Sequence, residues 1–295
     1  MLAPHLFEKI GFTDEMVAVY NKYKPLFGNE CDRLAKAYMR EGMDFEVALE
    51  EIHKKAPEVN ENTADMIFIL ECTGYSYQIY KEKNISDKIF YDSMADLTCK
   101  VRECKSLKGV YGTFVPKWYK GFLMGERFAL GRLQYDLWEH REDTVEVLGF
   151  KIEKGFKTIA CHIPSGSPLT YEAVLDSFKQ AYAFFSDRIK DGILLIECFS
   201  WLLFPDYQPI FKECAKNTYS FNNNFYIYET YPYEKFFDCW RLFNVDIEDC
   251  VIADLPEETR MQKGFKKYLM ENNKFGGGRG AALFDGEKIL TRKEM

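Results

Sequence analysis

Apolar positions recur every three or four residues from residue 14 to residue 103. A stripe with this period forms one face of an amphipathic α-helix, which is buried against neighbouring helices. Helix-ending residues such as Pro25 and Gly42 divide the pattern, and Asp44 and Ser86 suit helix N-caps because their side chains accept from free first-turn amides. We predict helices over residues 14–27, 28–40, 45–55, 63–81 and 87–103.

The periodicity changes after Gly109. Residues 111–125 mix glycine and proline with aromatic residues, and we interpret them as an ordered crossing segment because their rings favour burial. Alternation with period two follows and indicates strands. Strands are predicted over residues 127–138, 144–152, 157–163, 192–203, 225–230 and 281–284, and helices over residues 174–185, 207–215, 233–243 and 257–271. The chain therefore divides into a helical N-terminal domain, residues 1–122, and an α+β domain with a mixed sheet, residues 123–295.

The strand pattern predicts some of the sheet's organisation. A hairpin signal at residues 153–156 favours an antiparallel meander of the first three strands. Residues 192–203 are apolar on both faces, which is typical of a central strand covered on both sides. Gly131 indicates a bulge or a close backbone approach. The glycine-rich residues 276–280 are interpreted as a turn, with a phosphate contact through Arg279 as the alternative.

Charge and cysteine content exclude several classes of function. The formal net charge is −7, and an acidic chain without a concentrated basic patch repels nucleic acids. The nine cysteines include no CxxC pair and there are four histidines, so we expect no metal site. No window reaches the roughly 18 uncharged apolar residues of a membrane span. Residues 1–10 do not resemble a signal peptide, so free thiols and a cytoplasmic location are expected.

Three stretches carry a family resemblance. They are FALGRLQY at residues 128–135, HIPSGSPLT at residues 162–170 and CFSWLL at residues 198–203. They resemble signature stretches of a bacterial acyltransferase-domain family, which has a helical N-acyltransferase N-terminal domain and a GNAT-like C-terminal domain. The order of elements in the second domain is also similar to the GNAT core. The resemblance implies acyl-CoA as co-substrate, held between two diverging strands with its pyrophosphate at a helix N-terminus.

The glycine-containing segment before the helix at residues 174–185 is the candidate cofactor cradle. Free amides and the helix dipole make a helix N-terminus an anion site. The residues placed there are Ile163, Ser165, Gly166, Ser167, Leu169 and Thr170. The segment departs from the usual GNAT loop because it has a single glycine, and Pro168 lacks an N–H. The alternative is an ordinary helix start with Thr170 as N-cap.

His162, Glu197 and Tyr207 are the candidate catalytic residues. An imidazole titrates near neutral pH, so His162 can act as general base, or it can be a satisfied structural group. Glu197 lies in an apolar strand, where it can act as base through water or pair with an arginine such as Arg132. By resemblance, Tyr207 would protonate the leaving thiolate. A Cys198–His162 nucleophile pair is a further alternative that direct transfer does not require.

The preferred function is direct acyl transfer from acyl-CoA to an amine, with the helical domain shaping the acceptor side. The acceptor partner is expected to be a small-molecule or peptide amine, cationic or neutral, because the chain is acidic. Nucleic acid and membrane are not expected as partners. The alternative is a GNAT-like sensor or scaffold protein that binds CoA or a nucleotide without turnover, or a helical interaction module on an inactive core.

Overall fold

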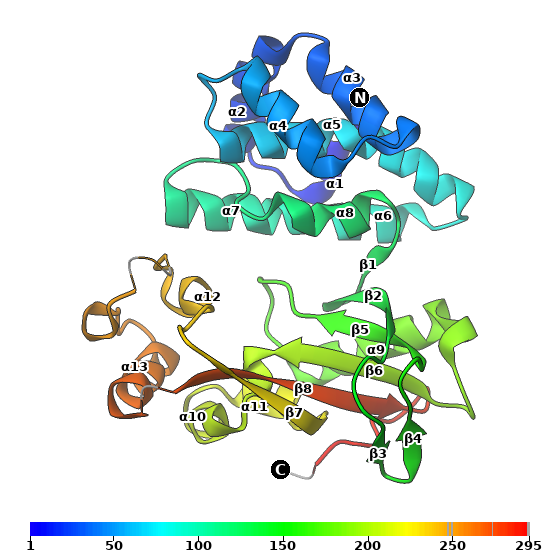
Figure 1. The fold of residues 1–295 in the computed structure, drawn as a ribbon, viewed down its shortest axis with the longest axis vertical. Coiled ribbons are helices and arrows are strands. Elements are labelled where there is room, and N and C mark those ends of the chain that lie inside the picture. The colour runs from blue at the N-terminus through cyan, green and yellow to red at the C-terminus, as the bar shows by residue number, and fades with distance from the viewer. Residues whose placement is uncertain (247, 249, 273, 294–295) are drawn as a thin grey trace. The chain divides into compact units, whose positions relative to one another are not determined.

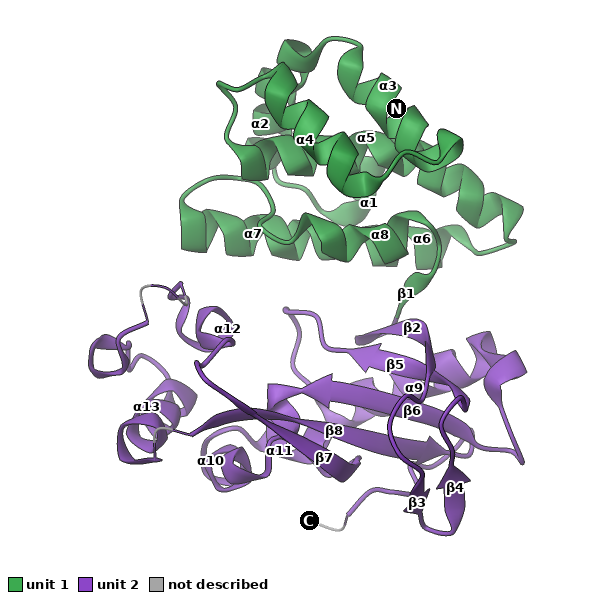
Figure 2. Ribbon diagram, in the orientation of Figure 1, with its two compact units in different colours: residues 1–129 green, residues 130–295 purple. Residues whose placement is uncertain are grey.

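The computed structural model describes residues 1–246, 248, 250–272 and 274–293 (Figure 1). Two compact units make up the chain, Met1–Ala129 (unit 1) and Leu130–Met295 (unit 2) (Figure 2). Unit 1 is mainly helical and unit 2 is built on a mixed sheet with helices, which confirms the predicted α+β fold class. The sequence prediction put the division after residue 122, and the two units divide after Ala129.

Unit 1 packs its helices around the long helix α5. Its helices are α1 (Leu6–Ile10), α2 (Asp14–Tyr23), η1 (Lys24–Phe27), α3 (Glu30–Glu41), α4 (Phe45–Lys55), α5 (Glu61–Glu82), α6 (Asp87–Met94), α7 (Asp96–Lys108), η2 (Pro116–Trp118) and α8 (Tyr119–Leu123). Every residue of α5 from Thr63 to Gly74 is buried. A helix that is apolar on most of its surface must be covered on all sides, as predicted for residues 63–81.

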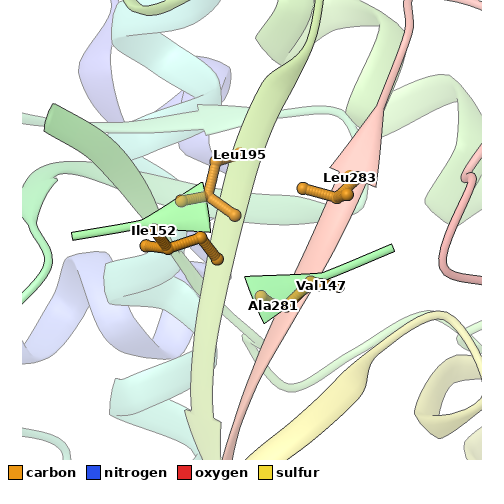
Figure 3. Packing of buried hydrophobic residues seen from close by; sticks show 5 residues of the cluster. All are labelled: Val147, Ile152, Leu195, Ala281 and Leu283. Carbon is orange, nitrogen blue, oxygen red and sulfur yellow. The ribbon is translucent and has the colours of Figure 1, made fainter. Parts of the chain in front are cut away.

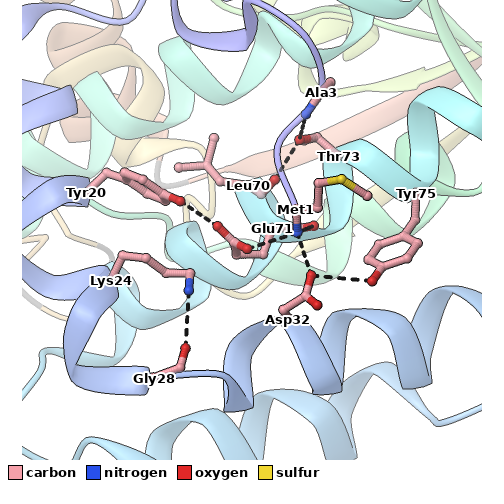
Figure 4. Close-up of polar contacts among 10 residues, drawn as sticks. All are labelled: Met1, Ala3, Tyr20, Lys24, Gly28, Asp32, Leu70, Glu71, Thr73 and Tyr75. Carbon is pink, nitrogen blue, oxygen red and sulfur yellow. Dashed lines mark hydrogen bonds and ion pairs between the residues drawn. The ribbon is translucent and has the colours of Figure 1, made fainter.

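A buried carboxylate joins three of these helices (Figure 4). Glu71 of α5 is 4% exposed, and its Oε1 accepts from the Tyr20 hydroxyl of α2 at 2.5 Å. The amino group of Met1 lies 2.9 Å from Glu71 Oε2 and 2.8 Å from Asp32 Oδ1 of α3. Burial and the hydrogen bond to Glu71 raise the pKa of Tyr20. Each oxygen of Glu71 thus has a donor, which offsets the penalty of burying its charge.

The predicted N-caps are confirmed, but one predicted helix is two. Asp44 accepts from the first-turn amides of α4, and Ser86 accepts from the amide of Ile89 in α6. The single helix predicted over residues 87–103 is wrong, because α6 ends at Met94 and α7 begins at Asp96. Asp96 accepts from the Tyr119 hydroxyl at 3.1 Å. This contact spans 23 residues and is invisible to local periodicity.

Unit 2 is organised by its sheet. The first strand, β1 (Arg127–Leu130), includes the last residues of unit 1. The others are β2 (Leu133–Glu139), β3 (Val145–Val147), β4 (Phe150–Ile152), β5 (Lys157–His162), β6 (Leu194–Ser200), β7 (Tyr226–Tyr233) and β8 (Phe275–Phe284). Among the described residues the main sheet has the order β1-β2-β5-β6-β8-β7, and β3 and β4 form a separate pair. The parallel pair β5–β6 lies inside the sheet, while β2–β5, β6–β8 and β7–β8 are antiparallel.

Helices of unit 2 follow the strands along the chain. They are α9 (Tyr171–Phe184), η3 (Ser186–Arg188), η4 (Trp201–Leu203), η5 (Pro205–Tyr207), α10 (Gln208–Cys214), α11 (Lys216–Asn222), α12 (Cys239–Phe243), η7 (Ile252–Asp254) and α13 (Arg260–Asn272). The sequence pattern missed α11. The helix predicted over residues 233–243 is wrong except at its end, because β7 continues to Tyr233, the partner of Phe275.

The main sheet has two differently covered faces. We call the face that carries Leu195 and Leu283 the front face, and the opposite one the back face. The hairpin β3–β4 packs on the front face, where Val147 and Ile152 join Leu195, Leu283 and Ala281 in a buried cluster (Figure 3). Helix α9 packs on the back face through the rings of Phe178 and Phe284, whose centroids are 5.8 Å apart. Residues on one strand alternate between these faces.

Two predicted strands are broken by residues with left-handed backbone. The strand expected over residues 144–152 is the hairpin β3–β4, turning at Leu148 (φ 51) and Gly149 (φ 80). The strand expected over residues 127–138 is split between β1 and β2 at Gly131 (φ 68), where an added Cβ would lie 3.3 Å from the Cα of Ser177 in α9. The predicted close approach at Gly131 is therefore confirmed. The predicted meander is corrected, since β5 pairs with β2 while β3 and β4 pair with each other.

The glycine-rich segment is a strand, so its interpretation as a turn is wrong. Residues 276–280 lie inside β8, paired on both sides with β6 and β7. A Cβ at Gly276 would lie 2.4 Å from the Phe204 ring, and one at Gly278 would lie 2.5 Å from the Leu203 carbonyl oxygen. Because these glycines have no side chain, η4 and Phe204 can pack directly against the sheet.

Replacing Gly278 with alanine is expected to lower the free energy of unfolding by about 1–3 kcal/mol, because the neighbouring group is backbone and cannot rotate away. Denaturant titration measures the change. The control is Thr230→Ser at the exposed residue that pairs with Gly278, with an expected change within about 0.5 kcal/mol. Equal effects of the two variants would show that the close approach does not require glycine.

Candidate functional site

The pairing between the parallel strands β5 and β6 ends before the strands themselves end, and we call this point their divergence. They pair from Ile159 with Ile196 to Cys161 with Cys198. Beyond that point β5 stays paired with β2 through His162, and β6 stays paired with β8 through Ser200. Both strands therefore continue past the last pair between them, as expected for a sheet that admits a ligand between two strands.

His162 lies on the front face at the point of divergence, and a carboxylate on the neighbouring strand contacts it. His162 Nε2 lies 3.0 Å from Asp136 Oδ2 of β2, and the two side chains are 27% and 22% exposed. When Nε2–H donates to Asp136, Nδ1 is the basic nitrogen of the neutral ring. A partly accessible imidazole oriented by a carboxylate is an arrangement that suits a general base.

Glu197 also faces the front, because it pairs with Ala160, two residues before His162. It is 3% exposed, and its Oε1 accepts from His140 Nδ1 at 2.5 Å and from the Tyr228 hydroxyl at 3.0 Å. Its Oε2 is buried without a hydrogen-bond partner among the described residues. The suggested pairing of Glu197 with Arg132 is wrong, since His140 holds that place.

His140, Glu197 and Tyr228 form a buried hydrogen-bonded cluster. The second ring nitrogen of His140, Nε2, lies 3.1 Å from the carbonyl oxygen of Asp143. Both ring nitrogens thus face acceptors, and both contacts are satisfied when the ring carries two protons. Burial and the adjacent Glu197 raise the pKa of Tyr228, so its hydroxyl keeps its proton and donates. Glu197 Oε1 thus has two hydrogen-bond partners, whereas Oε2 has none among the described residues.

The predicted cradle residues lie together between β5 and α9. Thr170 is the N-cap of α9, since its hydroxyl accepts from the amide of Ala173 at 3.3 Å. Arg132 donates to the carbonyl oxygens of Pro164 at 2.9 Å and Ser167 at 2.7 Å, which holds the loop. Gly166 is exposed with φ 121, and an added Cβ there would meet no described atom within 4 Å. Ile163, Ser165 and Leu169 complete the segment.

A cavity of about 520 Å³ adjoins this segment. It is lined by Arg132, Ser167, Pro168, Leu169, Glu213, Cys214, Ala215, Lys216, Asn217, Thr218 and Arg260. Three of its side chains are basic. Lys216 and Arg260 form no ion pair within the part of the chain that the structure describes. Three basic side chains and one acidic side chain, Glu213, thus line the cavity beside the loop that precedes α9, and the excess of positive charge suits an anionic ligand.

Two other candidate residues lie away from this group. Tyr207 is fully buried among aromatic rings, and its hydroxyl accepts from the amide of Gly276 at 3.2 Å. Its role as the acid stays a prediction. Cys198 alternates with Glu197 and faces the back, whereas His162 faces the front, so the structure does not bring this thiol to the imidazole. All nine cysteines lie in the described part of the chain and are free thiols there.

Neither a metal cluster nor a membrane span is found in the described residues. No group of three or more His, Cys, Asp or Glu side chains in the described ranges is placed to hold a metal ion. Among the helices described, none combines the length and apolar character that a bilayer crossing requires.

A helical unit joined to a sheet with two diverging parallel strands defines an acyltransferase-type fold of the GNAT class. Residues 1–125 match the family model of the N-acyltransferase N-terminal domain, and residues 128–282 match that of the GNAT-like C-terminal domain. The chain belongs to the GNAT-like C-terminal domain family, whose model spans more than half of it. The architecture predicted from the three sequence stretches is confirmed.

Solved structures share the fold across both units. An acyltransferase in complex with decanoyl-CoA and teicoplanin superposes with a TM-score of 0.70 at 15% identity, covering 94% of this chain and 86% of that one. The acyltransferase in complex with CoA and 10C-teicoplanin has a TM-score of 0.69 at 14% identity, covering 95% and 88%. One in complex with decanoyl-CoA alone has a TM-score of 0.62 at 16% identity, covering 95% and 99%. No curated protein matches the chain by sequence.

Sequence reasoning missed Asp136, His140 and Tyr228. Asp136 had a signal, since it falls at an alternating position in a predicted strand. His140 is one of only four histidines, which was a second signal. Tyr228 had none, because 19 tyrosines make any one of them inconspicuous. What joins the three residues to the site is cross-strand contact over 26 to 57 residues.

Proposed function

We propose that this protein is an N-acyltransferase that moves an acyl group from acyl-CoA directly to an amine. The observation that carries the proposal is the divergence of β5 and β6 beside His162 and Glu197. Family membership supports it, since both family models describe acyltransferase domains. The similar solved structures support it further, because their acyltransferase binds decanoyl-CoA, octanoyl-CoA or CoA.

The donor would bind with its phosphates at the start of α9. Amides of the segment from Ser165 to Leu169 supply uncharged donors there, and Lys216 and Arg260 supply positive charge in the adjoining cavity. The pantetheine arm then runs between β5 and β6, so that the thioester reaches the front face. Four of the six predicted cradle residues, Ser165, Gly166, Ser167 and Leu169, lie in this segment, while Ile163 directly follows β5 and Thr170 caps α9.

Either of the two front-face groups can supply the base. The amine nitrogen attacks the thioester carbonyl carbon, and His162 Nδ1 takes the proton released as the C–N bond forms. The C–S bond breaks, and CoA leaves as a thiolate that takes up a proton to give the free thiol. Glu197 is the alternative base, and it would act through a water that reaches Oε2, its buried oxygen without a partner among the described residues. Tyr207 is the acid predicted by resemblance, and that role requires the sulfur to reach a fully buried hydroxyl.

The similar structures suggest which substrates to test. Their acyltransferase binds medium-chain acyl-CoAs and the glycopeptide teicoplanin. We infer a medium-chain acyl-CoA as donor and a small-molecule or peptide amine as acceptor. Incubating the protein with decanoyl-CoA and a panel of primary amines is expected to release CoA thiol, read by a thiol-reactive dye, together with the amide by mass spectrometry. Donor binding without thiol release for any amine would instead support a non-catalytic CoA-binding protein.

Decanoyl-CoA is also expected to stabilise the protein, and Gly166→Asp is expected to abolish the effect. At about 100 times its dissociation constant a ligand adds roughly 2.7 kcal/mol, which is visible as a rise in Tm. An aspartate in the cradle adds bulk and a charge of the same sign as the phosphates. The control is Gly149→Asp in the β3–β4 turn, which also has positive φ and open space. A parent Tm that is unchanged at millimolar decanoyl-CoA would refute the donor site.

A further inference from the structure

Phe199 has an unusual position for a large apolar side chain. It lies on β6, an interior strand of the main sheet, yet it is 54% exposed. Interior strands normally have both faces covered. Phe199 follows Glu197 by two positions on the same strand. Its ring is therefore on the front face, where the proposed acyl transfer takes place.

The register of β5 and β6 relates Phe199 to His162. The last pair between β5 and β6 is Cys161 with Cys198, so His162 and Phe199 are the first residues beyond it. They would be partners if the pairing continued. A ligand that reaches the basic nitrogen of His162 from the front therefore passes beside this ring.

Neighbouring side chains form an aromatic surface around Phe199. The ring of Tyr231 on β7 meets that of Phe199 edge to face, with centroids 5.4 Å apart. The Arg279 guanidinium, on the β8 residue that pairs with Phe199, lies 5.8 Å from the Phe199 centroid and 5.6 Å from that of Tyr231. The surface thus consists of two aromatic rings in edge-to-face contact with one guanidinium beside them.

Charged side chains around this surface carry no excess of positive charge that would attract an anionic ligand. Arg279 is ion-paired with Glu142 and lies 3.9 Å from Glu229. Glu229 also accepts from the Tyr231 hydroxyl. Two carboxylates thus lie beside Arg279, and Arg141 adds a second guanidinium to its surroundings, so the charges around the surface balance. A ring bearing a neutral or cationic amine fits both the apolar surface and these charges.

We propose that Phe199 and Tyr231 form an acceptor subsite for an aromatic ring, so that the acceptor class is a primary amine carried on an aryl group. The subsite rests on the proposed acyl transfer and specifies its second substrate. The ring of the acceptor packs against Phe199, and its aminoalkyl arm extends across the diverging strands towards His162.

The test compares two amines that differ in aromaticity at nearly equal size, 2-phenylethylamine and 2-cyclohexylethylamine, with decanoyl-CoA as donor. The parent protein is expected to prefer the aryl amine by about three- to tenfold in kcat/KM, mainly through KM. Phe199→Leu should remove the preference and Phe199→Trp should keep it. Leu137→Ala, at a side chain that is 47% exposed on β2 and faces the back, is the control and should change neither.

A binding measurement separates this subsite from the proposed function. Saturation-transfer NMR of 2-phenylethylamine in the presence of CoA is expected to show contact with the parent and a several-fold weaker signal with Phe199→Leu. If no thiol is released from any amine of the panel while this difference persists, acyl transfer is refuted and the aryl site stands. Thiol release at equal kcat/KM from both amines, or an unchanged preference in Phe199→Leu, overturns the subsite.

Discussion

The His162→Ala variant is expected to acylate amines with a kcat lower by about 10²- to 10⁴-fold, while its affinity for CoA stays close to that of the parent. The loss follows from the role of Nδ1 as proton acceptor when the C–N bond forms. His162 is partly exposed and contacts Asp136, so its removal should leave the donor path intact. Steady-state kinetics with decanoyl-CoA and calorimetric titration of CoA measure the two quantities.

The chain contains a matched control for this experiment. His53 and Asp65 in unit 1 form a pair of the same kind, with Nε2 2.7 Å from Oδ1 and the His53 side chain 26% exposed. His53→Ala is expected to change stability and to leave kcat within about twofold, as substitutions away from a reaction centre do not alter transition-state contacts. A His162→Ala variant that loses CoA affinity and Tm together, with kcat unchanged, would make His162 a structural group.

Asp136 gives a second readout of the same assignment. Asp136→Asn keeps the side-chain shape and removes the charge that orients and stabilises the imidazole. It should lower kcat less than His162→Ala and leave the KM for decanoyl-CoA close to that of the parent, because the imidazole loses only the group that orients it. A kcat equal to that of the parent would exclude Asp136 as the positioning residue.

The Glu197→Ala variant is expected to lower the free energy of unfolding by about 3–5 kcal/mol, because it leaves the partner of a buried charge pair uncompensated. His140 has a side-chain exposure of 0%, and it would lose the carboxylate that accepts from Nδ1. The Tyr228 hydroxyl would lose its acceptor as well. Denaturant titration of the parent and the variant measures the change.

A double variant distinguishes charge compensation from packing in this cluster. Glu197→Leu combined with His140→Leu removes both charges, so the pair should be destabilised less than the sum of the two single variants. Tyr228→Phe removes one donor to a charged acceptor and should cost about 1.5–3 kcal/mol. Additive single effects would show that His140 and Glu197 are not coupled.

Glu197→Gln keeps the shape, so a large loss of kcat with little loss of stability would identify a direct role as the base.

Local signals in the sequence were sufficient for most helices of unit 1. Asp44 and Ser86 cap α4 and α6 as predicted, because capping uses a side chain and amides within three residues of each other. The fully buried character of α5 could also be read from its composition. The division between α6 and α7 could not be predicted. Asp96, where α7 begins, is hydrogen-bonded to Tyr119, and a contact between residues so far apart in the chain leaves no local periodicity.

Local sequence signals also predicted part of the candidate site. His162 and Glu197 were found because each is a lone polar residue at the apolar end or middle of a strand. Their partners Asp136, His140 and Tyr228 come from other strands and loops. Pairing register decides these contacts, and a shift of one residue would move every side chain to the other face.

The sequence by itself determined the two-part architecture, the caps at Asp44 and Ser86, most helices and strands at the level of their existence, and through three short stretches the family. These features depend on residues close together in the chain or on stretches that can be compared directly. Only the tertiary structure decided that residues 276–280 form a paired strand, because their lack of side chains admits Phe204 and the Leu203 carbonyl from η4 and the segment after it. It alone placed His162 opposite Phe199, since strand divergence is set by the contacts of β5 with β2 and of β6 with β8.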